Sequence, residues 1–299
     1  VQTCALPICL FETARLEHQN LTDTSKIDLI PIQIYVRPRP RNELSPEIIF
    51  SDENNAFNLG IGLGYTNRNF FGDARSFNAT IRARSQDIQR WNLKEVFGGR
   101  GFRDPSVVGA IELQAQVLQP YFFTRSLSFS LTATLSAEKQ SEYILSIFRN
   151  KIGLNNQFAT YTYGSADWTL ERVSPEFLND TVNSALILSN RKDEDLPQFN
   201  SILTLTLQRD KTNDIFSPTD GFFNSISLEE SGILPKLLPG IRAGLPFTQY
   251  YKVTLSGRWY QDLTNTRYNI LAVKLKGGYQ DKYGERDRKS TRLNSSHRT

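Results

Sequence analysis

Apolar and polar residues alternate with a period of two along most of the chain. The longest run spans residues 125–136, where five apolar side chains alternate with small hydroxyl side chains. Successive side chains of a β-strand point to opposite faces, so this segment predicts a strand with one apolar and one polar face. A strand of about a dozen residues with this pattern suits lipid on one side and a wet lumen on the other.

The same alternation recurs on both sides of this segment. It is found at residues 57–65, 77–84, 111–117, 148–155, 166–171, 203–208, 225–229, 252–259 and 271–279. Residues 44–51 are a candidate first strand, which Pro46 confines to a sheet edge because proline cannot donate to a ladder. The polar faces carry Lys, Arg and Glu, whose burial in a soluble core costs roughly several kcal/mol each if they are unpaired. The pattern therefore predicts an all-β, antiparallel transmembrane β-barrel with a water-filled lumen.

The connections between these segments fall into two classes. Short or modest ones are expected near residues 69–74, 124–125, 160–163, 211–221 and 263–267, and long ones at 88–107, 174–198 and 232–246, although the connection at 137–142 is short. Outer-membrane barrels have short periplasmic turns and longer outside loops. Aromatic residues gather at the short class: Phe70, Phe71, Tyr121, Phe122, Phe123, Phe158, Tyr161, Tyr163, Phe216, Phe222, Phe223, Tyr260 and Tyr268. This grouping predicts an interfacial aromatic girdle at the periplasmic rim.

Composition excludes several classes of protein. The chain has 299 residues and no apolar stretch near the roughly 18 residues of a transmembrane helix. Its net charge of +4 comes from scattered residues, which gives no nucleic-acid-binding patch.

No cofactor, metal site or enzymatic activity is predicted. A hydrolase nucleophile needs a base such as histidine, and the only histidines, His18 and His297, lie outside the predicted barrel. The lumenal carboxylates at Glu112, Asp167, Glu171 and Glu229 are expected to be solvated or paired with Arg82, Lys252 or Lys274.

The two ends of the chain lack the strand pattern. Residues 1–9, which contain both cysteines, and residues 286–299 resemble translated adaptor sequence and are interpreted as non-native. The natural protein is then expected to continue past both ends. Residues 10–41 differ again: 11–19 and 26–37, joined by a turn-rich segment, predict a hairpin from a small α/β unit, ended by Pro38 and Pro40. The barrel is assigned to residues 42–285.

The layout resembles the BamA/TamA family of outer-membrane assembly proteins. The matching motifs are T-x-R-L-E at 13–17, I-D-L-I-P-I-Q-I-Y-V at 27–36, G-x-G-Y-x-x-R-N-F-F-G-D at 62–73, L-Q-P-Y-F at 118–122 and R-D-K-T-N-D-I-F-S-P-T-D-G at 209–221. The resemblance implies POTRA domains followed by a sixteen-stranded barrel. Residues 10–41 would be the C-terminal hairpin of the last POTRA domain, and the chain would hold about eleven of the sixteen strands, leaving the barrel incomplete.

The resemblance also assigns candidate sites. Ile48, Ile49 and Phe50 would belong to the seam strand. The turn between barrel strands eight and nine would use Arg209, Asp210, Pro218, Thr219, Asp220 and Gly221, with Pro218 setting φ and Gly221 permitting a left-handed exit. Arg100, Gly101 and Phe102 spell the family's sixth-loop motif, but they precede the fourth strand and are interpreted as a lookalike in an outside loop.

The implied function is mechanical: the weakly paired seam templates client strands in the bacterial outer membrane after the POTRA domains deliver them. The implied partners are outer-membrane lipid, unfolded β-barrel clients, periplasmic chaperones and accessory lipoproteins. Two alternatives remain open at this point. One is a TamA-type role in autotransporter secretion or lipid traffic, and the other is a passive porin, which would not need the POTRA-like hairpin.

Overall fold

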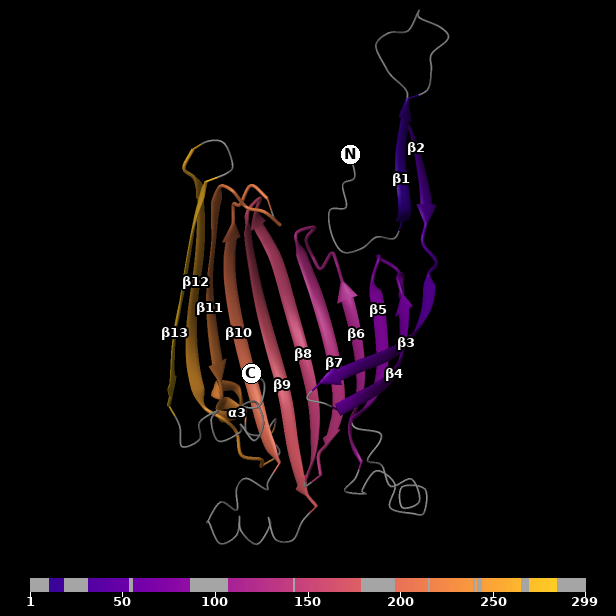
Figure 1. Ribbon diagram of the computed structural model, residues 1–299, viewed down its shortest axis with the longest axis vertical. Coiled ribbons are helices and arrows are strands. Elements are labelled where there is room, and N and C mark those ends of the chain that lie inside the picture. The colour runs from indigo at the N-terminus through magenta and orange to yellow at the C-terminus, as the bar shows by residue number, and fades with distance from the viewer. Residues whose placement is uncertain are drawn as a thin grey trace, which may run out of the picture.

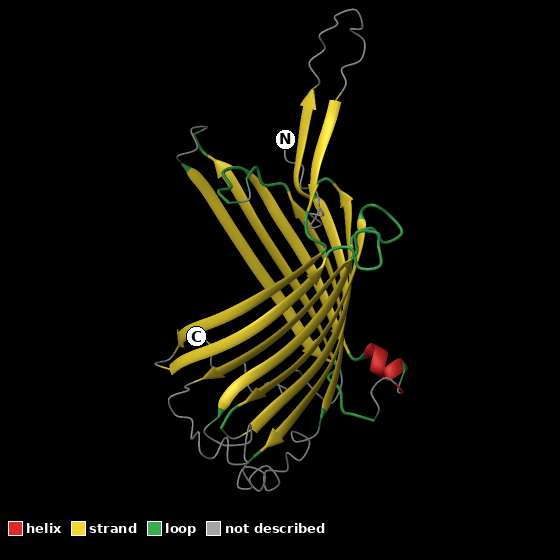
Figure 2. Cartoon of the chain, turned by 90° about the vertical axis from the view of Figure 1, so that its right-hand side faces the viewer, coloured by secondary structure: helices red, strands yellow, loops and turns green. Residues whose placement is uncertain are grey.

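A curled antiparallel sheet of eleven strands forms most of the molecule (Figures 1 and 2). The computed structural model describes residues 11–18, 32–53, 56–86, 107–141, 143–178, 197–214, 216–238, 240, 244–264 and 269–283. The sheet strands are β3 (Asn42–Glu53), β4 (Ala56–Asn67), β5 (Ser76–Gln86), β6 (Val108–Gln119), β7 (Leu127–Lys139), β8 (Tyr143–Ala159), β9 (Thr162–Phe177), β10 (Gln198–Asp210), β11 (Gly221–Ser231), β12 (Tyr250–Asp262) and β13 (Ile270–Lys282). All eleven predicted strands are present.

Each strand of the sheet pairs with its neighbours in the sequence. The order runs from β13 to β3 without a crossover, and β3 and β13 are its two edges. They are not paired with each other, so the sheet is an open arc (Figure 2). The predicted incomplete barrel is confirmed. None of the helices in the described ranges is long and apolar enough to cross a membrane.

A separate hairpin precedes the sheet. β1 (Phe11–His18) pairs antiparallel with β2 (Ile32–Pro38). It projects beyond the end of the sheet that carries the short turns (Figure 1). The opposite end carries α3 (Ile233–Leu237), in the connection from β11 to β12.

The two faces of the sheet differ as the alternation predicts. Strand β7 begins two residues later than predicted and continues to Lys139. Its apolar residues share a face with Leu113 and Ile111 of β6, because the register pairs Leu135 with Leu113. Along the described chain only Val107 and Tyr250 are buried hydrophobic residues, while many Leu, Ile and Phe side chains are exposed. Apolar surface is therefore directed outward to lipid rather than into a core.

Ion pairs line the opposite, lumenal face. They are Arg82–Glu47, Arg149–Glu171, Lys151–Asp167 and Lys252–Glu229, with closest N···O distances of 2.9, 2.5, 3.2 and 3.5 Å. The predicted pairing of a lumenal carboxylate with Lys252 is confirmed. Arg82 forms its ion pair with Glu47 two strands away, a contact that sequence spacing does not reveal. Glu112 lies opposite Arg82 in the β5–β6 register.

Two of the short turns are built alike, and each holds a pair of phenylalanines. Phe70 stacks on Phe77 (5.1 Å between ring centroids), and Phe122 stacks on Phe129 (5.2 Å). In each turn the next residue, Phe71 or Phe123, has positive φ (55° and 61°). These two rings are 79% and 91% exposed. The predicted aromatic rim is present at both turns, with one ring packed on a strand and the other directed outward.

The first test uses adjacent residues of β6 that face opposite sides. Leu113→Arg puts a charge on the lipid-facing side, and Gln114→Arg puts the same charge in the lumen, opposite the neutral Thr80 and Thr134. In the complete protein in lipid vesicles, Leu113→Arg should lower the free energy of unfolding by about 2–4 kcal/mol, as for arginine near the bilayer midplane. Gln114→Arg should change it by less than about 1 kcal/mol. Equal losses in urea titrations would contradict the assignment of the two faces.

Candidate functional site

Strand β3 has one unpaired edge. Along the strand, the backbone N–H and C=O groups of successive residues point alternately to β4 and to this unpaired edge. Arg68 donates its backbone N–H to the carbonyl oxygen of Arg41 (2.9 Å), which makes this a hydrogen-bonded pair. Such pairs alternate with non-hydrogen-bonded ones in an antiparallel ladder, and the β3–β4 register has no shift. Ile49, opposite Gly60, therefore bonds to β4. Ile48 and Phe50 direct their N–H and C=O groups to the free edge.

The side chains of these three residues also divide between the faces. Ile48 and Phe50 point to the lipid side and are 69% and 64% exposed. Ile49 points to the lumen, where its Cβ lies near Gly60. The three predicted seam residues thus lie together on the edge strand, but only Ile48 and Phe50 offer both an apolar surface and free backbone groups.

Pro46 lies at an edge-directed position of β3. Its missing N–H would have pointed away from β4, so the β3–β4 ladder loses no hydrogen bond. The prediction that Pro46 confines this strand to an edge is confirmed. It leaves a gap in the row of edge donors, with Leu44 on the periplasmic side of the gap and Ile48 on the other.

A glycine track in β4 joins β3 to β5 across the lumenal face. Gly60, Gly62 and Gly64 leave the middle of this face of β4 without side chains. Arg82 of β5 therefore reaches over β4 to Glu47 of β3, with Nε–Oε2 2.9 Å and Nη2–Oε1 3.2 Å. A Cβ on Gly62 would lie 3.2 Å from both Arg82 Cγ and Glu47 Oε2. The glycines thus allow a bidentate ion pair to hold the edge strand from two strands away.

The periplasmic end of β3 is held by a second polar set. The Asn42 Oδ1 atom accepts hydrogen bonds from Tyr65 and Asn67, both at 3.0 Å. Arg68 pairs with Glu43 and donates to the carbonyl oxygen of Pro40 (2.9 Å). These bonds anchor the start of β3 and the segment that links it to the β1–β2 hairpin.

The predicted turn motif between β10 and β11 is a network of side chain to backbone hydrogen bonds. Asp210 Oδ1 accepts from the N–H of Thr212 (3.1 Å), and Asn213 Oδ1 accepts from the N–H groups of Thr219 and Asp220 (3.0 and 3.1 Å). Gly221 has φ 108°, which confirms the left-handed exit. A Cβ there would lie 2.1 Å from the carbonyl oxygen of Lys211, so only glycine fits.

Two further residues of this turn were not singled out from the sequence. Asp214 accepts backbone hydrogen bonds from Ser217 (2.8 Å) and Phe216 (2.7 Å), and these bonds hold the pKa of its carboxyl below the usual value. Asn213 connects the two halves of the turn. Asn and Asp preferences for turns give a signal for both, but not for which amides they bind.

The positions of the other predicted site residues are as follows. Pro218 lies within the turn, and Arg209 lies on the lipid-facing side of β10. Arg100, Gly101 and Phe102 lie outside the described residues, as does Tyr268.

A buried polar cluster that the sequence did not reveal lies at the long-loop end of the lumenal face. Tyr250 is fully buried and donates its hydroxyl to Glu229 Oε1 (2.5 Å). Thr248 donates to Asn200 Oδ1 (3.0 Å), and Asn200 Nδ2 donates to Glu171 Oε1 (3.3 Å). These bonds link Tyr250 of β12 to β11, and Thr248 in the segment before β12 to β10 and β9.

Comparison with known proteins places this chain beside a protein family and beside solved structures. The Omp85 superfamily domain matches residues 109–296. Among solved structures, the chain is similar to BamA from Haemophilus ducreyi lacking POTRA domains 1–3, with a TM-score of 0.54 and 13% sequence identity. This match covers 92% of the chain and 47% of the BamA chain, so the chain spans about half the length of that relative. No curated protein matches this chain.

Two glycines test the strain at the turn. Gly221→Ala and Gly72→Ala both place a side chain at positive φ (108° and 90°), but only Gly221 has atoms within contact distance. Gly72→Ala should cost about 1 kcal/mol, and Gly221→Ala should cost about 3 kcal/mol or more because it adds a clash with Lys211. Unfolding midpoints in vesicles measure both. Equal losses would show that the turn opens freely.

Two alanine variants in the glycine track of β4 test whether the Glu47–Arg82 pair holds β3. Gly62→Ala would crowd both Glu47 and Arg82, whereas a Cβ on Gly64 would lie 3.6 Å from the carbonyl oxygen and 3.8 Å from the Cβ of Ser45, which are ordinary contacts. Amide hydrogen exchange of Glu47 and Ile49, whose N–H groups bond to β4, should therefore speed up in Gly62→Ala and stay unchanged in Gly64→Ala. Unchanged exchange in both variants would mean that the Glu47–Arg82 pair does not hold the edge strand.

Proposed function

Because the chain belongs to the Omp85 superfamily, we propose that it is part of a factor that assembles β-barrel proteins into the bacterial outer membrane by templating client strands on β3. The chain is an outer-membrane protein of this superfamily, in agreement with the BamA/TamA-like motifs of its sequence. The proposal concerns how its edge is used.

One observation carries the proposal: β3 has free backbone groups on its edge together with outward apolar side chains. An extended client segment can add to such an edge by main-chain hydrogen bonds, with its apolar side chains continuing the lipid-facing surface. Ile48 and Phe50 supply both features. In lipid an unpaired backbone group has no water to bond, so an edge of this kind favours a strand as its partner.

We also propose a path by which unfolded clients reach β3. The β1–β2 hairpin projects from the end of the sheet with the short turns and leads directly into β3. We interpret it as the end of the last POTRA domain, which would hand unfolded clients to β3 from the periplasm. Periplasmic chaperones and accessory lipoproteins would supply those clients. The work is mechanical, since it requires strand exchange and no bond breaking in the client.

Proline variants can distinguish backbone N–H groups on the unpaired edge of β3 from those that bond to β4. The double variant Ile48→Pro/Phe50→Pro in the complete protein removes two edge donors and leaves the β3–β4 ladder intact. At about 1 kcal/mol per hydrogen bond, client insertion into vesicles should slow by about tenfold or more. Ile48→Ala/Phe50→Ala keeps both N–H groups and serves as the matched control.

A folded double-proline variant that inserts clients at the normal rate would refute the proposal. Ile49→Pro should behave differently from the edge variants, because it removes a bond to Gly60 and should raise amide exchange in β3 and β4.

A further inference from the structure

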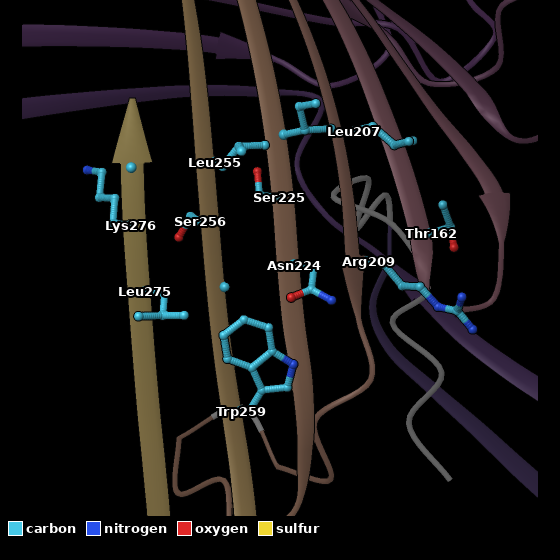
Figure 3. A pocket seen from close by; sticks show the side chains of 13 residues that line it. Thr162, Leu207, Arg209, Asn224, Ser225, Leu255, Ser256, Trp259, Leu275 and Lys276 are labelled. Carbon is cyan, nitrogen blue, oxygen red and sulfur yellow. The ribbon is translucent and has the colours of Figure 1, made fainter. Parts of the chain in front are cut away.

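A depression of about 830 Å³ lies on the lipid-facing side of β10–β13 (Figure 3). Apolar side chains make most of its wall, among them Leu207, Ile226, Leu255 and Leu275. It lies toward the periplasmic end, because Arg209 at its border is one residue from the end of β10. An apolar hollow of this size is in the range of ligand pockets, and this one opens toward hydrocarbon.

Two glycines and a tryptophan shape the hollow. Gly257 and Gly277 leave the lipid-facing surface of β12 and β13 without side chains. The Trp259 ring lies back over Gly257, where an added Cβ would be 2.3 Å from indole Cη2. The indole thus forms one wall while the rest of the notch stays open (Figure 3). The hollow is built by the sequence of β12 and is not a gap between strands, since β11, β12 and β13 are fully paired here.

Arg209 gives the hollow a positive charge that no acid among the described residues pairs with. Its position in β10 places it on the same face as Leu207, and its cross-strand partners are Thr162 and Asn224. Within the described chain no carboxylate lies within ion-pair distance of Arg209, and its guanidinium lies 5.7 Å from the centroid of the Phe222 ring. By contrast, Arg82, Arg149, Lys151 and Lys252 in the lumen are all paired with acids. A lone cation facing lipid near the headgroup level is suited to an anion from the membrane itself.

We propose that this hollow binds an anionic phospholipid of the periplasmic leaflet. The phosphate lies on Arg209, a residue whose planar fork matches phosphate oxygens, and Asn224 offers a further donor beside it. One acyl chain runs from there toward Leu255 and Leu275, past the face of Trp259. This site is separate from the free edge of β3 and does not depend on the proposed assembly function.

The chain offers a closely matched control arginine. Arg258 lies on β12 with its guanidinium 4.4 Å from the centroid of the Phe223 ring, but it faces the lumen. Arg209 and Arg258 are therefore both arginines stacked near a phenylalanine in the same part of the sheet, on opposite faces. Arg209→Gln and Arg258→Gln remove the same charge, and only the first faces lipid.

Native mass spectrometry of the complete protein tests the site. The protein is reconstituted in vesicles of equal parts phosphatidylglycerol and phosphatidylcholine, extracted in mild detergent, and its retained lipids are counted. The wild-type protein and Arg258→Gln should retain one phosphatidylglycerol more than Arg209→Gln, in which this species should fall at least tenfold. Equal retention by Arg209→Gln and wild type, or equal retention of the two lipids by wild type, would overturn the proposal.

A second measurement needs no variant of the arginine. The emission of Trp259 is obtained as the difference between the wild-type protein and Trp259→Phe. Phosphatidylglycerol with brominated acyl chains, diluted into phosphatidylcholine vesicles, should quench this emission at least twofold more than brominated phosphatidylcholine at the same mole fraction. Equal quenching by the two lipids would show that the hollow meets only bulk lipid, and would overturn the proposal.

Discussion

Hydrocarbon offers no hydrogen-bond partner to a peptide group, and the whole architecture depends on this constraint. Every strand from β4 to β12 meets it by pairing on both sides with its sequence neighbours. The constraint also explains why apolar side chains point outward and ion pairs lie in the lumen, since only that side is wet. Stability here comes from ladders and from side chains matched to two solvents, and much less from a packed interior.

Strand β3, one of the two edge strands, is paired on one side only, and the surrounding residues compensate for this. Glu47 and Arg82 hold β3 across the glycine track of β4, while Asn42, Tyr65 and Arg68 hold its periplasmic end. Pro46 then removes one donor from the free side without weakening the ladder. Strand β3 is thus held along the edge that pairs with β4, while its other edge stays unpaired. The proposed role as a template needs both properties, because a strand that frays cannot direct the pairing of another.

Glycine and aromatic residues act together at the periplasmic side of the sheet. Phe158 lies over Gly164 as Trp259 lies over Gly257, and in both cases a Cβ on the glycine would collide with the ring. Phe70 and Phe122 pack on Phe77 and Phe129, near the starts of β5 and β7. The neighbouring rings of Phe71 and Phe123 are exposed. Aromatic rings near the periplasmic turns pack against the strands and expose apolar surface at the boundary between the bilayer and water. The lipid-facing hollow beside Arg209 is one product of this arrangement.

The sequence by itself determined the strands, their two faces and the division into short and long connections. These depend on a period of two and on turn chemistry, both of which are local, as residues 125–136 and Gly221 illustrate. Tertiary structure alone decided which side chains meet across strands. Arg82 pairs with Glu47 because the register aligns both with Gly62. Arg209 has no acid within ion-pair distance in the part of the chain that the structure describes, because its cross-strand partners are Thr162 and Asn224. Register follows from the pairing of whole strands, so no single segment of the chain contains it.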